Sequence, residues 1–171
     1  MKKLIAIISL TLFIPGLMFA QVTKTHTDKK AKFSIKHPPK WSKKVNQGDI
    51  NVIFASPDNL ANVQVVKAVV DEKVDAKGFL AQVEQAAGGR TNQVPEEQRA
   101  AEAADLKKMN ADEGAMGVYQ IEQEGTKINQ LIAIVRKGKV FYSIIVTFAA
   151  EAEGQYKDIA TKMADSFIVL K

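Results

Sequence analysis

Three long segments near the C-terminal end of the chain alternate in hydrophobicity and are separated only by short turns that contain glycine. They span residues 115–124, 127–137 and 139–149. Alternation with a period of two is typical of β-strands, and turns this short join antiparallel neighbours. In the last segment both sets of alternating side chains are largely apolar, which indicates a strand covered on both faces. The pattern predicts an antiparallel sheet with helices on each side.

The rest of the sequence supports the same architecture. Shorter alternating segments predict strands at 33–37, 50–54 and 62–70, the last either covered on both faces or bulged. Helical periodicity predicts a helix over 75–87 capped by Asp75, a short peripheral helix from Pro95 to about Lys108, and a final helix from about Ala152. We therefore predict an α+β fold, an α/β/α sandwich with a central antiparallel sheet of about six strands and helices on both faces.

The N-terminus has the layout of a secretory signal peptide. Two lysines precede an apolar stretch that is broken by Pro15 and Gly16 and followed by small residues up to Ala20. This layout predicts residues 1–20 as a cleaved signal, 21–30 as a loose polar arm and 31–171 as one domain. A retained membrane anchor is the alternative. After cleavage near Ala20 the protein would be periplasmic or secreted.

The positive charge of the chain is concentrated directly after this signal. Residues 21–44 contain eight lysines and one acidic residue, Asp28, whereas residues 45–171 carry a net charge of −4. From this concentration we predict a binding surface for an acidic protein partner or an anionic membrane surface, and no nucleic acid. The simpler interpretation, which we favour, is that these lysines solubilise and protect an exposed edge strand. The predicted contact residues are Lys36, Lys40, Trp41, Lys43 and Lys44.

Several short strings resemble the PsbP-like and Mog-like domain superfamily. Residues 33–41 (FSIKHPPKW) are similar to its opening Phe-x-Ile-x-Tyr-Pro-x-x-Trp strand, with His37 in place of the usual tyrosine, and residues 54–57 (FASP) fit the next element. Residues 62–65, 114–119 and 165–167 resemble later elements in the same order. The resemblance covers about residues 31–170.

This resemblance implies an α/β/α sandwich and a non-enzymatic binding or assembly role. The superfamily includes photosystem II proteins that involve calcium and manganese, Mog proteins that bind the GTPase Ran, and bacterial relatives such as DcrB-like envelope proteins. The predicted signal peptide favours the bacterial envelope relatives over the other two branches.

Catalytic and cofactor chemistry finds little support in the sequence. The chain has no cysteine, which excludes disulfides, thiol catalysis and cysteine-based metal sites. Only His26 and His37 are available, and we expect His37 to be a strand-end residue stacked near Trp41 rather than a catalytic base. The Gly88-Gly89-Arg90 string fits the end of a helix better than a phosphate loop.

We therefore predict no catalytic residue, no metal ligand and no cofactor, with calcium at Asp71, Glu72 and Asp75 as the minor alternative. A Glu122–Glu124 pair on one strand face is expected to be solvated. The predicted function is that of an exported, non-catalytic binding or assembly factor of the cell envelope. The alternatives are a small-ligand or lipid-binding envelope protein, or a hydrolase with a pocket between sheet and helix.

Overall fold

The computed structural model describes residues 22–70, 73–86, 92–123 and 125–171. The predicted signal at 1–20 lies outside the described residues. The strands are β1 (Lys24–Asp28), β2 (Phe33–His37), β3 (Ser42–Gln47), β4 (Ile50–Ala55), β5 (Ala61–Val69), β6 (Glu113–Gln123), β7 (Thr126–Lys137), β8 (Val140–Ala149) and β9 (Ile168–Val169). The helices are α1 (Ala76–Ala86), α2 (Ala103–Met109) and α3 (Glu153–Asp165), with short 3₁₀ turns at Glu96–Gln98 and Ala150–Ala152.

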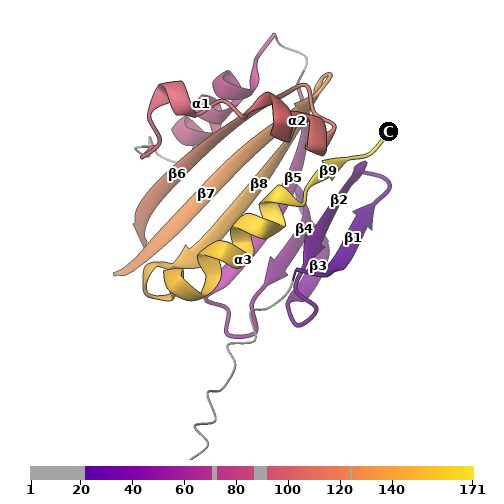
Figure 1. The fold of residues 1–171 in the computed structure, drawn as a ribbon. Coiled ribbons are helices and arrows are strands. Elements are labelled where there is room, and N and C mark those ends of the chain that lie inside the picture. The colour runs from indigo at the N-terminus through magenta and orange to yellow at the C-terminus, as the bar shows by residue number, and fades with distance from the viewer. Residues whose placement is uncertain (1–21, 71–72, 87–91, 124) are drawn as a thin grey trace, which may run out of the picture.

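The main sheet has six antiparallel strands in the order β3-β4-β5-β8-β7-β6 (Figure 1). The predicted meander is confirmed as β6, β7 and β8, with Gly125 and Gly138 at positive φ in its two turns. β8 lies between β5 and β7 and is buried along most of its length, as the two apolar faces of its sequence predict. The pairing of β4 with β5 shifts register between Ile50 and Val52, so the irregularity lies in β4.

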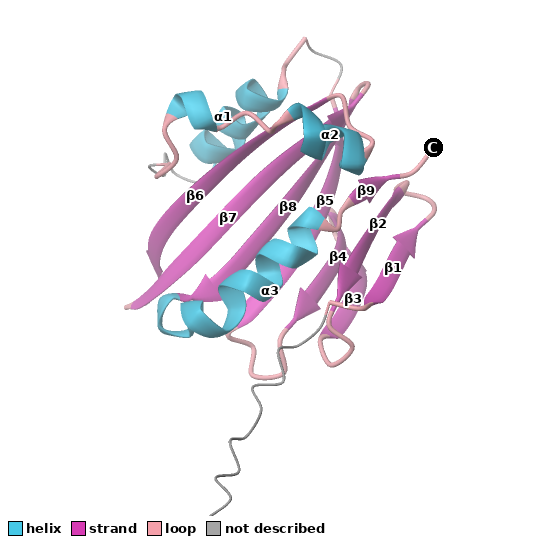
Figure 2. Cartoon of the chain, in the orientation of Figure 1, coloured by secondary structure: helices cyan, strands magenta, loops and turns pink. Residues whose placement is uncertain are grey.

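Helices cover both faces of the main sheet, which confirms the predicted sandwich (Figure 2). One face packs against α3, and this larger core includes Phe54 of β4 and Met163 of α3. The other face packs against α1, where Leu80 meets Tyr119 of β6 and Phe141 of β8. Asp75 caps α1 as predicted, because its Oδ1 accepts a hydrogen bond from the Gly78 amide at 2.7 Å.

The prediction of about six strands is confirmed, but the sheet contains a different sixth strand. We expected residues 33–37 in the central sheet; instead β2 lies in a separate sheet of order β1-β2-β9, beside α3 (Figure 1). The turn after β2, in which the Trp41 amide donates to the Pro38 carbonyl, leads from this small sheet to the main sheet. There β3 takes the sixth place. All six β3 residues are exposed, so no alternation of burial marks this strand in the sequence.

The expectation that residues 21–30 form a loose arm is also wrong. Residues 24–28 form β1, which pairs with β2 along its whole length. The amide of Ala31 donates to the Asp28 carboxylate at 2.8 Å and fixes the turn between the two strands. The physical reason is that β2 presents a hydrogen-bonding edge that a polar segment can occupy without contributing large apolar side chains.

The expected helix from Pro95 to Lys108 is interrupted. A 3₁₀ turn at Glu96–Gln98 and the helix α2 are separated by an extended stretch that runs along the outer edge of β6. The Met116 amide donates to the Arg99 carbonyl at 2.8 Å, and the Ala101 amide donates to the Gly114 carbonyl at 2.9 Å. Pairing with an otherwise open strand edge therefore overrides helical propensity here.

Candidate functional site

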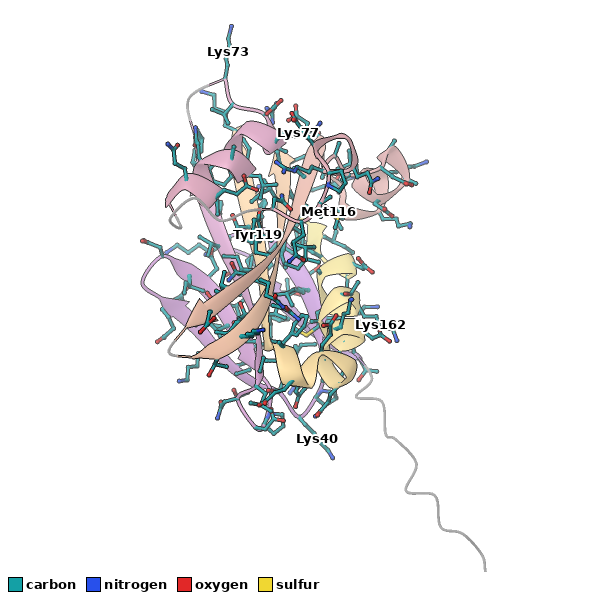
Figure 3. All side chains as sticks on the ribbon, turned by 90° about the vertical axis from the view of Figure 1, so that its left-hand side faces the viewer. Lys40, Lys73, Lys77, Met116, Tyr119 and Lys162 are labelled. Carbon is teal, nitrogen blue, oxygen red and sulfur yellow. The ribbon has the colours of Figure 1, made fainter. Side chains whose placement is uncertain are left out.

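The predicted binding residues lie on and between the strands β2 and β3, at one side of the molecule. Lys36 projects from β2, Lys40 lies in the turn, and Lys43 and Lys44 lie on β3; all four are exposed. Figure 3 shows Lys40 at the opposite end of the molecule from Lys73. We use the name lysine surface for the exposed lysines of this region, which are Lys24, Lys29, Lys30, Lys32, Lys36, Lys40, Lys43 and Lys44.

The lysine surface is electrostatically uncompensated. Within the described part of the chain none of its lysines forms an ion pair, whereas Lys108, Lys137 and Lys157 are each paired with a carboxylate within 2.9 Å. The carboxylate of Asp28, the acidic residue of this region, accepts a hydrogen bond from the Ala31 amide. Unpaired like charges raise the local potential and attract anionic groups in a salt-dependent manner.

Trp41 has a different position from the lysines around it. It is only 5% exposed and packs in the main core, with its ring edge-on to Tyr156 of α3 at 5.9 Å. The Tyr156 hydroxyl donates in turn to the Asp58 carboxylate at 2.5 Å. Trp41 therefore anchors the Pro38–Trp41 turn between sheet and helix, and its ring face is not displayed as a stacking platform.

His26 and His37 lie between the small sheet and the main sheet. His37 is buried and stacks on Phe54 at 4.5 Å, rather than near Trp41 as expected, while its Nδ1 donates to the Pro38 carbonyl at 2.9 Å. Burial lowers the pKa of both histidines below the ordinary value of 6.5, and the charge of Lys43 acts in the same direction. At neutral pH this shift favours the neutral form of both rings.

Neither histidine has the partners of a catalytic base. In the described residues no serine or carboxylate is hydrogen-bonded to either ring, and the Nε2 atom of His26 is buried without a hydrogen-bond partner. A general base needs a nucleophile within hydrogen-bonding reach, whereas here the His37 ring stacks on Phe54 and the His26 ring makes edge contacts with Phe33 and Phe54. The arrangement packs the two sheets together.

Acidic residues in the described part of the chain do not gather into a metal site. No group of three histidine or acidic side chains there could hold a metal ion. The Asp75 side chain caps α1, and the calcium alternative otherwise rests on residues 71 and 72, which lie outside the described residues. Glu124 and the 88–90 string also lie outside them. Asp112 and Glu113 pair with Lys137 and Arg136.

The structure also contains a groove that sequence reasoning missed. A cavity of about 450 Å³ lies between α2, α3 and the face of β6 and β7, and we call it the α2–α3 groove. Met116 and Leu131 contribute to its floor, and Figure 3 shows Met116 and Tyr119 on opposite sides of β6. A smaller cavity of about 220 Å³ follows on and shares Leu131 and Thr161 with it.

The one sequence signal for this groove is the run of small residues where the layers cross. Gly114, Ala133 and Ala164 line the groove from β6, β7 and α3, and larger side chains at the two alanines would occupy the space. The alanines of residues 100–104 are small, and they predict a helix that buries little apolar surface. α2 indeed has no buried residue, but this property does not locate a cavity.

Among the described residues, none of the helices has the length and hydrophobicity that a membrane-spanning helix requires.

The first two of the following solved structures share the fold with this chain at low sequence identity. A protein from Bacteroides thetaiotaomicron has a TM-score of 0.60 and 14% identity over 88% of this chain, which spans only 50% of the length of that chain. LpqN of Mycobacterium tuberculosis has a TM-score of 0.56 and 10% identity, covering 81% of this chain and 83% of LpqN. The cyanobacterial PsbP of Synechocystis sp. PCC 6803 has a TM-score of 0.49 and 13% identity, covering 90% and 95%.

No curated protein matches the sequence. The sequence model of the PsbP family, however, matches residues 21–169, which include every strand and helix described above. This match begins ten residues earlier than the resemblance noted in the sequence. It therefore includes β1, which the structure shows to be part of the fold. The chain belongs to the PsbP family.

Proposed function

We propose that this protein is an exported, non-catalytic binding or assembly factor of the cell envelope that acts through protein–protein contacts. The observation that carries the proposal is the lysine surface, whose eight exposed lysines have no ion-pair partner among the described residues. A surface of one sign destabilises the fold by self-repulsion, and it attracts oppositely charged partners. The partner we propose is an acidic protein.

Membership of the PsbP family and the fold shared with LpqN support this role. LpqN is described as involved in cell envelope biogenesis of Mycobacterium tuberculosis. Export rests on the signal predicted from the sequence. The closer affiliation with Mog-like or DcrB-like proteins remains a prediction.

The test is charge reversal at the four predicted lysines. Lys36, Lys40, Lys43 and Lys44 are changed together to Glu, and capture of partners is measured by crosslinking in the native envelope with identification by mass spectrometry. We expect loss of the principal acidic crosslinked protein, and the same loss for the unchanged protein when salt is raised to about 0.5 M, because screening weakens exposed charges.

The matched control changes four exposed lysines elsewhere, Lys107, Lys127, Lys162 and Lys171, to Glu. It has the same net charge as the test variant, so it should retain the crosslink. Equal loss in both variants would show that total charge, and not the lysine surface, governs capture. Binding of the unchanged protein to anionic vesicles, with no acidic protein crosslinked, would instead support the membrane alternative.

A second candidate function, small-ligand binding, is favoured by one observation, the α2–α3 groove. Its volume of about 450 Å³ lies within the usual range of ligand pockets, roughly 300–1,000 Å³. The residues that line it include neither serine nor histidine, so they do not form a Ser–His hydrolase site.

A further inference from the structure

We propose that the α2–α3 groove binds a small amphipathic cation, a ligand with a short apolar chain and a positively charged head group. The proposal rests on the second candidate function and names its ligand class; it is independent of the lysine surface. It combines two features of the same cavity, an apolar floor and a rim whose charge is predominantly negative.

The floor of the groove is apolar and incompletely covered. Met116 of β6, Leu131 and Ala133 of β7 and Met109 of α2 are all half-buried hydrophobic residues. Each Å² of apolar surface removed from water contributes about 25 cal/mol, so an alkyl chain seated on this floor would be stabilised. The two methionines can adjust their conformation to the shape of such a chain.

The space above the floor exists because the surrounding elements carry small residues. Ala133 and Ala164 face the cavity from β7 and α3. At the α2 end the elements touch: a Cβ at Gly114 would lie 2.8 Å from the Ala101 side chain and 3.1 Å from Leu106. The groove is therefore closed beneath the start of α2 and has room between α2 and α3.

The rim of the groove has three carboxylates and one ammonium group. The charged residues that line it are Glu102, Asp105, Lys108 and Asp165. Lys108 is already paired with Asp105 at 2.9 Å, which leaves Asp165 without an ion-pair partner among the described residues. Burial and the negative charge of Asp105 raise the pKa of Asp165 above its ordinary value of 3.8, and the positive charge of Lys108 offsets this only in part. A ligand cation near Asp165 would relieve this repulsion.

The test compares three eight-carbon probes that differ only in the head group. Octylammonium, octanoate and 1-octanol are titrated into the folded protein by calorimetry at fixed ionic strength. We expect one-to-one binding of octylammonium, at least about tenfold tighter than octanoate, with octanol between them. Equal or tighter binding of octanoate would overturn the cationic part of the proposal, and absence of binding by all three would overturn the site.

Two variants locate the binding, each with a matched control. Thr161→Leu fills the groove from an exposed position of α3, and it should abolish binding, whereas Ala81→Leu on the exposed side of α1 should not. Asp165→Asn should weaken octylammonium about fivefold and leave octanol unchanged, the size expected for a partly exposed charge pair. Asp158→Asn, in the same helix but outside the groove, is its control.

Folding of every variant is checked by its thermal transition. The four-lysine charge-reversal variant should bind octylammonium as the unchanged protein does. Loss of partner capture with retained octylammonium binding would thus separate failure of one site from failure of the other. If Thr161→Leu bound octylammonium normally, the ligand would lie elsewhere and the assignment would be wrong.

Discussion

The two outer edges of the main sheet are protected in opposite ways. The β6 edge is covered by the chain itself, since residues 92–101 exchange backbone hydrogen bonds with Gly114, Met116 and Val118. The β3 edge is not paired with any strand among the described residues, and Lys43 and Lys44 project from it. A strand edge left open is a template for pairing with other chains, and both devices prevent this.

The difference shows what each kind of protection leaves available. A backbone cover satisfies the edge permanently and removes it from contact with partners. Charge protection excludes neutral and positive strands but leaves the edge accessible to an acidic partner. The edge that the fold leaves uncovered is thus the one on which we place the binding surface, whereas the cover over β6 helps to form the α2–α3 groove.

Gly117→Ala should have the largest effect, by breaking the cover over β6. A Cβ at this position would collide with the Tyr119 hydroxyl and lie 2.6 Å from the Asn92 side-chain nitrogen. Tyr119 cannot yield easily, because its hydroxyl donates to Glu84 at 2.6 Å. We expect a loss of about 3 kcal/mol in the free energy of unfolding, measured by denaturant titration.

The control for this change is Gly154→Ala, a glycine of α3 with nothing within 4 Å of its added Cβ. Alanine is the better helix former, so stability should rise by up to about 1 kcal/mol. A loss at Gly154 as large as that at Gly117 would mean that the collision is not the cause.

Asn92→Ala should have the next largest effect. The Asn92 Oδ1 accepts hydrogen bonds from the amides of Val94 and Val118, and its Nδ2 donates to Glu84. Removing it should cost about 1–2 kcal/mol and speed hydrogen exchange at Val118. Asn62→Ala, which loses only a bond from the Gln64 side chain, should change stability much less. Unchanged exchange at Val118 would show that the cover holds without this residue.

The elements of the main sheet that have a regular alternation of apolar and polar residues could be predicted from the sequence. Alternation along β6, β7 and β8 is regular because each strand has a buried face, so the sheet and its helices could be derived. β3 carries no such signal, since all its residues are exposed, and the pairing of residues 92–101 with β6 depends on a backbone edge that no side-chain pattern records.

For the site, the concentration of lysines was visible in the sequence, but their arrangement was not. Trp41 lies within the same nine residues as Lys36 and Lys44, yet it is buried because the Pro38 turn directs it toward Tyr156. The α2–α3 groove could not be predicted, because it depends on how three separate elements cross.

Acidification should destabilise the β3 side of the molecule by a smaller amount. Folding lowers the pKa of His26 and His37, so below the ordinary value of 6.5 the unfolded chain binds more protons than the folded one. This contribution to stability is complete above pH 6.5 and is lost as the pH falls toward the folded-state pKa values. We expect the melting temperature to decrease between about pH 7 and pH 5.

The double variant His26→Gln/His37→Gln should flatten this pH dependence, whatever its own stability. Asp58 does not interfere, because hydrogen bonds from Ser56 and Tyr156 hold its pKa below 3.8, and its contribution is lost only at lower pH. Burial raises the pKa of Asp165, which acts in the opposite direction, but this contribution is common to both proteins. A slope between pH 7 and pH 5 that is the same in both proteins would remove the histidines from the account.

Lys43→Gln/Lys44→Gln should have the smallest effect on stability. This double variant tests directly whether charge protects the open β3 edge. Both side chains are exposed and unpaired among the described residues, so the free energy of unfolding should change by less than about 0.5 kcal/mol. Removing two charges from an uncovered edge should nevertheless permit β3 to pair with a second copy. Sedimentation velocity over a concentration series should then show self-association that the unchanged protein lacks.

Lys127→Gln/Lys162→Gln removes the same charge from exposed positions away from β3, and this control should stay as monodisperse as the unchanged protein. High salt should also promote association of the unchanged protein, since it screens the same two lysines. If the variant with both β3 lysines replaced did not associate, the bend at the end of β3, and not its charge, would be what prevents pairing with a second copy. Asn46 at φ 53° and Gly48 at φ 60° already bend β3 at its end, and the open edge would then be too short for a partner strand as well.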